Sequence, residues 1–68
     1  MKFGNLRAEL SRKGISQKQL ADEVKLRPET LSKKMLGKTE FTYGEIKKIR
    51  DFINPDLKLE YLFAEETA

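Results

Sequence analysis

The stretch of sequence that decides the fold is ISQKQLADEVKLRPETLSKKMLGK, residues 15–38. Within it, apolar side chains recur at intervals of three or four residues, the spacing that places them on one face of an α-helix. They are Leu20, Ala21, Val24, Leu31 and Met35. This spacing predicts two short helices, over residues 17–24 and 28–36, that bury their apolar faces together.

The ends of both helices carry their own signals. Ser16, with Gln19 three residues later, forms the capping-box pattern that begins a helix. Pro28 stands at a first helical position, where its missing amide hydrogen costs nothing, and Gly37 can adopt the left-handed conformation that ends a helix. The interval 25–27 leaves only a three-residue turn, so the second helix must cross the first at a steep angle. This arrangement is a helix-turn-helix, whose second helix can enter the DNA major groove.

The rest of the chain continues the helical spacing. Gly14 ends a helix that contains Leu6 and Leu10, and Thr42 with Glu45 repeats the capping-box pattern. The further predicted helices cover residues 5–13, 43–53 and 58–64. No segment alternates apolar and polar residues long enough for a strand. We therefore expect an all-α fold, a compact bundle of five short helices with the helix-turn-helix at its centre.

Length and composition exclude several classes of protein. Sixty-eight residues with 38% apolar side chains suffice for one domain, which we expect to span residues 1–68. The chain has neither cysteine nor histidine, which removes disulfides, the usual zinc ligands and any catalytic triad with an imidazole base. We expect no enzymatic activity, no catalytic or metal-binding residue and no cofactor.

The N-terminus is interrupted by charges, as in MKFGNLRAELSRK, and lacks the apolar segment of a signal peptide. The longest apolar run, residues 61–64, is far shorter than the roughly 20 residues that span a bilayer. These features predict a soluble cytoplasmic protein without a membrane partner.

Charge is divided unevenly along the chain. Residues 1–50 hold 13 basic and six acidic side chains, whereas residues 51–68 hold one basic and five acidic side chains. The division suggests a body that binds a polyanion and a tail outside the contact. A soluble domain with uneven charge remains the plainer interpretation.

The outer face of the second helix is predicted by its geometry. With Leu31 pointing inward, steps of about 100° per residue place Met35 on the same side and Glu29 and Lys33 nearly opposite. Side chains at the helix ends and in the adjoining loops are expected to meet phosphate. Pro28 and Ser32 flank these two outward residues. The basic residues expected near phosphate are Arg27, Lys34 and Lys38.

Residues 15–38 resemble the helix-turn-helix of phage repressors and Cro proteins, the lambda-repressor-like DNA-binding domains. The resemblance rests on Ser16-Gln17 and Leu20-Ala21 at the opening, on the apolar positions and on the closing Gly37. The run GKTEFTYGEIKKI, residues 37–49, is similar to small Cro-like regulators of phages and prophages of Gram-positive bacteria. The resemblance covers about residues 5–63.

This resemblance implies a transcription regulator, a repressor or Cro-type switch, that binds a roughly palindromic double-stranded operator as a homodimer. It also implies that Gln17 donates to a phosphate, as does Lys38 just after the second helix. The base-facing positions would be those of Pro28, Glu29 and Lys33, with Ser32 beside them. The short chain leaves no room for an effector domain, so we expect no small-molecule effector. The segment 57–63 is a candidate dimer seam, although the favoured assignment of Tyr61 and Phe63 is to the core.

The sequence departs from the family pattern in three ways. Lys25 stands where glycine is usual, so the turn needs a lysine at positive φ, at a cost of about 1 kcal/mol. Arg27 replaces the usual Ser or Thr, which removes the side-chain cap of the second helix. Leu10 and Met35 occupy the positions of an Arg–Glu pair, which predicts an apolar contact in its place.

Other interpretations remain open. The same five helices could form a protein-interaction module, such as an antitoxin or a phage assembly subunit, and exposure of Leu36 would favour that function. RNA binding is less favoured because aromatic residues do not interleave with the basic ones. Each of three residues also has a role that does not involve DNA. Gln17 could be an ordinary polar residue at a helix start, and Lys33 could be a solvated lysine. Glu29 could interact favourably with the positive end of the helix dipole.

Overall fold

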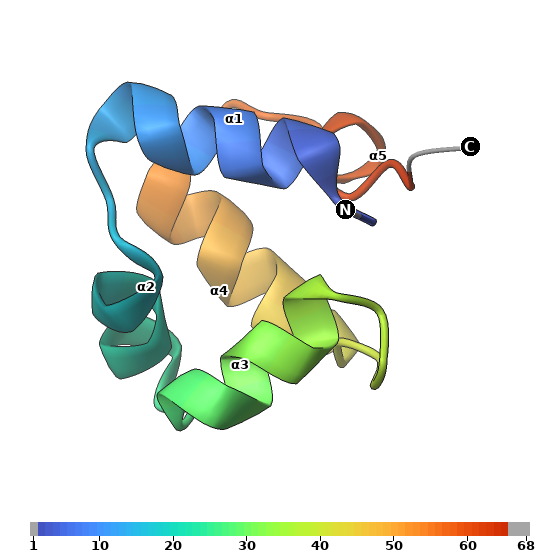
Figure 1. Cartoon of the computed structure of the whole chain (residues 1–68). Helices are drawn as coiled ribbons and strands as arrows, with labels where there is room; N and C mark the ends of the chain where they lie inside the picture. Colours follow the sequence, from blue (N-terminus) through green and yellow to red (C-terminus); the bar gives the residue numbers. More distant parts are fainter. Residues whose placement is uncertain (1, 66–68) are drawn as a thin grey trace.

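The structure is a computed structural model that describes residues 2–65 (Figure 1). Its helices are α1 Gly4–Lys13, α2 Gln17–Val24, α3 Pro28–Met35, α4 Tyr43–Ile53 and α5 Leu59–Leu62. No strand occurs in this range, so the predicted all-α fold is confirmed. The bounds of α1 to α4 lie within one residue of those predicted. The predicted helix 58–64 is too long, because Phe63 already leaves helical geometry, with φ −105°.

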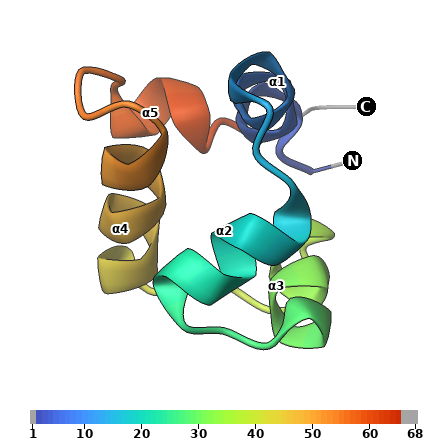
Figure 2. The same cartoon turned by 90° about the vertical axis from the view of Figure 1, so that its left-hand side faces the viewer.

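The helices form two pairs that α4 joins. α2 packs against α3 and α4, while α5 packs against α1 and α4, as Figure 2 shows. Each helix contributes side chains to a single core. Each fully buried leucine or isoleucine side chain stabilises the folded protein by about 1.5–3 kcal/mol. The buried apolar side chains are those of Phe3, Leu6, Leu10, Leu20, Ala21, Val24, Leu31, Met35, Ile49, Ile53 and Leu62. No helix among the described residues is long and apolar enough to cross a membrane.

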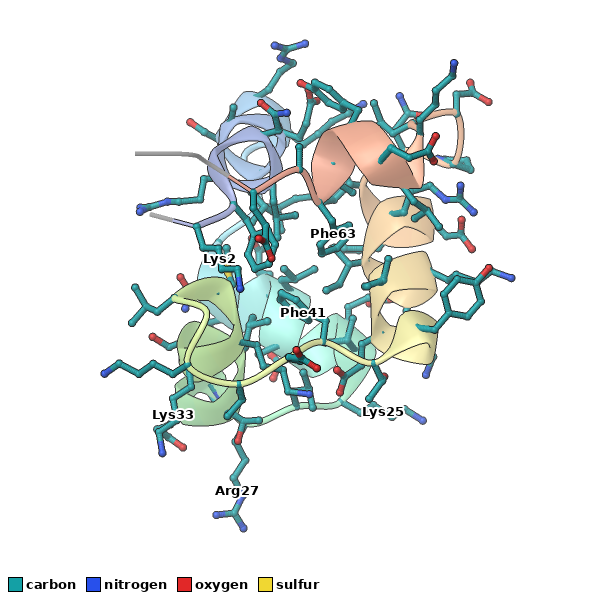
Figure 3. All side chains as sticks on the ribbon, turned by 90° about the vertical axis from the view of Figure 1, so that its right-hand side faces the viewer. Lys2, Lys25, Arg27, Lys33, Phe41 and Phe63 are labelled. Carbon is teal, nitrogen blue, oxygen red and sulfur yellow. The ribbon has the colours of Figure 1, made fainter. Side chains whose placement is uncertain are left out.

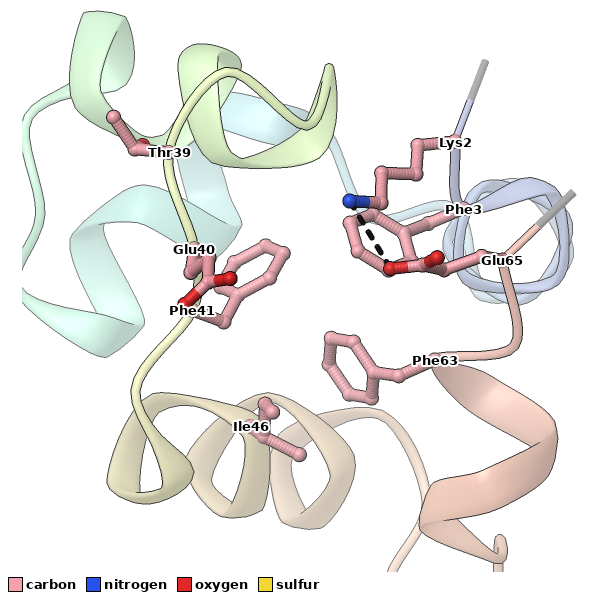
Figure 4. Close-up of a pocket in the computed structure, with 8 residues that line it drawn as sticks. All are labelled: Lys2, Phe3, Thr39, Glu40, Phe41, Ile46, Phe63 and Glu65. Atoms are coloured by element: carbon pink, nitrogen blue, oxygen red, sulfur yellow. Dashed lines mark ion pairs between the residues drawn. The ribbon is translucent and has the colours of Figure 1, made fainter.

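Three phenylalanines hold the ends of the described chain together. The rings of Phe3, Phe41 and Phe63 pack edge to face, with centroids 5.4–5.8 Å apart. Beside them, Lys2 Nζ lies 3.0 Å from Glu65 Oε1 (Figure 4). Phe63 therefore packs inside its own protomer, as predicted for a core residue.

Candidate nucleic-acid interface

The first helix of the motif begins as predicted. The Ser16 hydroxyl accepts from the Gln19 amide at 3.0 Å, and the Gln19 side chain accepts from the Ser16 amide at 2.8 Å. These two bonds satisfy amides that would otherwise lack a partner at the start of α2. Gln17 is therefore fixed as the first residue of α2, with its side chain exposed.

The turn between α2 and α3 is built on Lys25. Its φ of 59° and ψ of 42° are left-handed. The amides of Lys25 and Leu26 donate to the carbonyls of Asp22 and Ala21, at 3.3 and 2.9 Å. Gly14, with φ 67°, ends α1 through the same two-bond pattern, which satisfies the last carbonyls of a helix. The lysine thus takes the conformation expected of glycine at this position, and the turn keeps its normal hydrogen bonds.

The second helix of the motif begins at Pro28 without a side-chain cap, because its N-cap Arg27 makes no cap hydrogen bond. The Arg27 side chain is exposed and, like that of Lys33, points away from the body of the protein (Figure 3). Leu31 is buried, whereas Glu29 is exposed. The division of this helix into an inner and an outer face follows the predicted 100° spacing.

The remaining predicted site residues surround this outer face. Pro28 is exposed and Ser32 is half-buried. Beyond the end of α3, Gly37 has φ 83°, and the Lys38 amide donates to the Lys33 carbonyl at 2.9 Å. These bonds place exposed Lys38 just past one end of α3, while Arg27 stands at the other end.

The two apolar residues predicted to replace the Arg–Glu pair both belong to the core. Leu10 and Met35 are 5% and 3% exposed. Both face a small pocket of about 180 Å³, whose lining also includes Gln17. Gln17, at the start of α2, and Met35, at the end of α3, therefore line the same pocket.

The prediction that Lys34 meets a phosphate is wrong. Its Nζ lies 2.6 Å from Glu45 Oε1 on α4, and its side chain is only 12% exposed, so it does not reach outward to a phosphate. The helical spacing already indicates this position, because Lys34 lies about 60° from Leu31 around the helix axis and thus near the buried side of α3.

A second polar contact was not foreseen. Glu9 is buried, and its carboxylate accepts a 2.8 Å hydrogen bond from the Tyr61 hydroxyl. Tyr61 itself is 41% exposed, so its assignment to the core was wrong. The signal for Glu9 was its position three residues after Leu6, which places a carboxylate on the apolar face of α1.

Comparison with known families agrees with this geometry. A model of the family described as helix-turn-helix matches residues 6–59. Neither the search of curated proteins nor the search of solved structures gave a significant match. The matched range includes both helices of the motif, the turn at Lys25 and the loop that carries Lys38. The chain therefore belongs to the helix-turn-helix family of DNA-binding regulators, the family of the phage repressors and Cro proteins.

Proposed function

We propose that this protein is a sequence-specific transcription regulator, a repressor or Cro-type switch, in which residues 1–68 act as one DNA-binding domain and α3 enters the major groove. The observation that carries the proposal is the polar outer face of α3, where Glu29 and Lys33 are exposed while Leu31 and Met35 are buried. Pro28 and Ser32 flank this face.

The proposed readout follows from the side chains. The Lys33 ammonium can donate to guanine O6 and N7, and the Glu29 carboxylate can accept from cytosine N4. Gln17, Arg27 and Lys38 surround the helix and would bind phosphates, which fix the register of the protein without reading sequence. Arg27 and Lys38 would also make binding dependent on salt, because charged phosphate contacts release counterions.

We further propose a homodimer on a roughly palindromic operator, paired through residues 57–63. This segment lies in the acidic part of the chain, so pairing there keeps the basic faces apart. Phe63 is unsuitable as a probe because its ring packs inside the protomer. Leu59 is half-buried and lies outside the core cluster. Sedimentation should show self-association that Leu59→Asp weakens and Leu36→Asp leaves unchanged, whereas a strict monomer on DNA would contradict the dimer.

Selection of binding sites from randomised duplex DNA tests the function directly. Enrichment of one motif with two-fold symmetry is the expected result. An unenriched pool would contradict sequence-specific recognition.

One observation favours a second candidate, a protein-interaction module such as an antitoxin or a phage assembly subunit. Leu36, at the end of α3, is 48% exposed and adjoins the outer face. The neighbouring Glu29 and Lys33 are charged, so this apolar contact would be small. The same selection separates the two candidates, because an interaction module would enrich no duplex.

A further inference from the structure

The loop between α3 and α4, residues 36–42, carries Lys38, and one carboxylate oxygen holds both ends of this loop. Glu45 Oε1 accepts from Lys34 Nζ at 2.6 Å and from the Thr42 amide at 2.9 Å. Lys34 belongs to the last turn of α3, and Thr42 is the N-cap of α4. The carboxylate therefore fixes the distance across which the loop must close.

The carboxylate is itself held in place. The Glu45 amide donates to Thr42 Oγ1 at 3.2 Å, which completes a capping box at the start of α4. Burial alone would raise the pKa of Glu45, but the hydrogen bonds from Lys34 and Thr42 outweigh burial and lower it. With side chains only 12% and 18% exposed, the two charges are poorly screened by salt.

Two apolar contacts complete the attachment of the loop. A Cβ added at Gly37 would lie 2.5 Å from Lys2 Cδ, so the Lys2 side chain covers this end of the loop closely. At the other end, the Phe41 ring packs against Phe3 and Phe63 (Figure 4). The amides of Gly37 and Lys38 bond to carbonyls of α3, and the Lys34–Glu45 pair in addition ties the last turn of α3 to the first turn of α4 across the loop.

We infer that the Lys34–Glu45 pair positions the loop so that Lys38 meets a DNA phosphate while α3 lies in the groove. This inference rests on the proposed function, because it assigns how one of the proposed phosphate contacts is aligned. The Lys38 side chain has no partner within residues 2–65, so only the backbone of the loop sets where its ammonium begins. Lys34 would thus act on binding without touching DNA.

A double-mutant cycle on the operator obtained by selection tests the inference. Lys34→Met removes the ammonium and keeps an apolar stem, and Lys38→Ala removes the proposed phosphate contact. Each single variant should weaken binding by about 2- to 10-fold, and the double variant should bind no more weakly than Lys38→Ala alone. Lys47→Met, which removes an exposed lysine of α4, is the control for loss of charge. Its fold-change in affinity should multiply with that of Lys38→Ala.

The opposite charge change sharpens the test. Glu45→Gln removes a negative charge and can still accept from the Thr42 amide, so simple electrostatics predicts tighter binding and a steeper salt dependence. The inference predicts weaker binding instead, with a shallower salt dependence. Thermal unfolding must show that each variant is folded at the assay temperature. If Lys34→Met is not folded, Glu45→Gln carries the test, and Lys34→Arg, which keeps the charge, should bind close to wild type.

Three outcomes would overturn the inference. Multiplicative effects of Lys34→Met and Lys38→Ala would mean that Lys34 acts independently of Lys38. Tighter binding by Glu45→Gln would mean that Glu45 affects binding through its charge alone and not by positioning the loop. If Lys38→Ala alone leaves binding to every duplex unchanged, the proposed phosphate contact itself is wrong. Only that last result counts against the proposed function as well.

Discussion

Tyr61 and Glu9 join the last described helix to the first: the Tyr61 hydroxyl donates a 2.8 Å hydrogen bond to Oε2 of a Glu9 side chain that is 7% exposed. The hydrogen bond to the carboxylate raises the pKa of Tyr61. Arg12 Nη1 lies farther away, at 3.8 Å from the same oxygen, and Asn5 Nδ2 donates to the Tyr61 carbonyl at 2.8 Å. α5, only four residues long, is thus attached to α1 by polar as well as apolar contacts.

Tyr61→Phe should therefore lower the melting temperature, because it leaves a buried carboxylate oxygen without its hydrogen-bond donor. Tyr43→Phe is the matched control, since Tyr43 is 68% exposed and its hydroxyl makes no hydrogen bond within residues 2–65. Thermal unfolding followed by circular dichroism measures both. Equal melting temperatures for the two variants would show that the Glu9–Tyr61 bond does not stabilise the fold.

Leu10→Ala should reduce the free energy of unfolding by about 2–5 kcal/mol, since Leu10 is 5% exposed and would leave a cavity beside Met35. Such a loss is a large share of the stability of a small domain. Denaturant unfolding provides the measurement, with Leu36→Ala as the control at a half-exposed position. A cost for Leu10→Ala as small as that of the control would contradict the burial of Leu10 in the core.

Lys25→Gly should raise the free energy of unfolding by up to about 1 kcal/mol, because glycine adopts the left-handed conformation of this turn without steric strain. Lys18→Gly, within α2, should have the opposite sign, since glycine inside a helix costs about 1 kcal/mol. Both can be measured in the same denaturation series. Destabilisation by Lys25→Gly would mean that the lysine side chain makes a stabilising contact that offsets the strain.

The sequence was sufficient for the helices because their limits depend on local chemistry. The Ser16 and Thr42 capping boxes and the left-handed Gly14 and Gly37 lie where the pattern predicts. The positive φ of Lys25 could also be anticipated, because the family that the sequence resembles usually has glycine at this position. The end of α5 could not be predicted, because no local signal marks Phe63 as the residue at which helical geometry ends.

The outer face of α3 was also predictable. Once one residue of a helix is known to point inward, the regular step of about 100° per residue gives the direction of every other side chain. The partner of Lys34 was not, because Glu45 comes 11 residues later and is brought near by the closure of the loop. For the same reason, the contact between Glu9 and Tyr61, 52 residues apart, required the packing of α5 on α1. Local patterns determine which way a side chain points, and only the tertiary fold determines what it meets.

The lowered pKa of Glu45 predicts that the stability of the protein depends on pH. Its pKa in the folded protein is lowered from an ordinary value of 4.5, so its contribution to stability is complete above that pH and is lost as pH falls through the lowered value. The difference in free energy of unfolding between wild type and Glu45→Gln should therefore be constant from about pH 5.5 to 8 and shrink below pH 4.5. A difference that persists unchanged to about pH 2 would show that ionisation of Glu45 contributes nothing.

The most direct measurement for the central claim compares Lys33→Ala with Lys38→Ala on the selected operator and on random duplexes across a range of salt concentrations. Lys33 lies on the outer face of α3 and Lys38 beyond its end, so the two substitutions should differ. Lys33→Ala should cost roughly 1–3 kcal/mol on the operator and much less on random DNA. Lys38→Ala should weaken binding to all duplexes alike and reduce the salt slope by about 1 per subunit. If the two variants are indistinguishable on specific and random duplexes, α3 does not read bases, and only a generic basic surface remains.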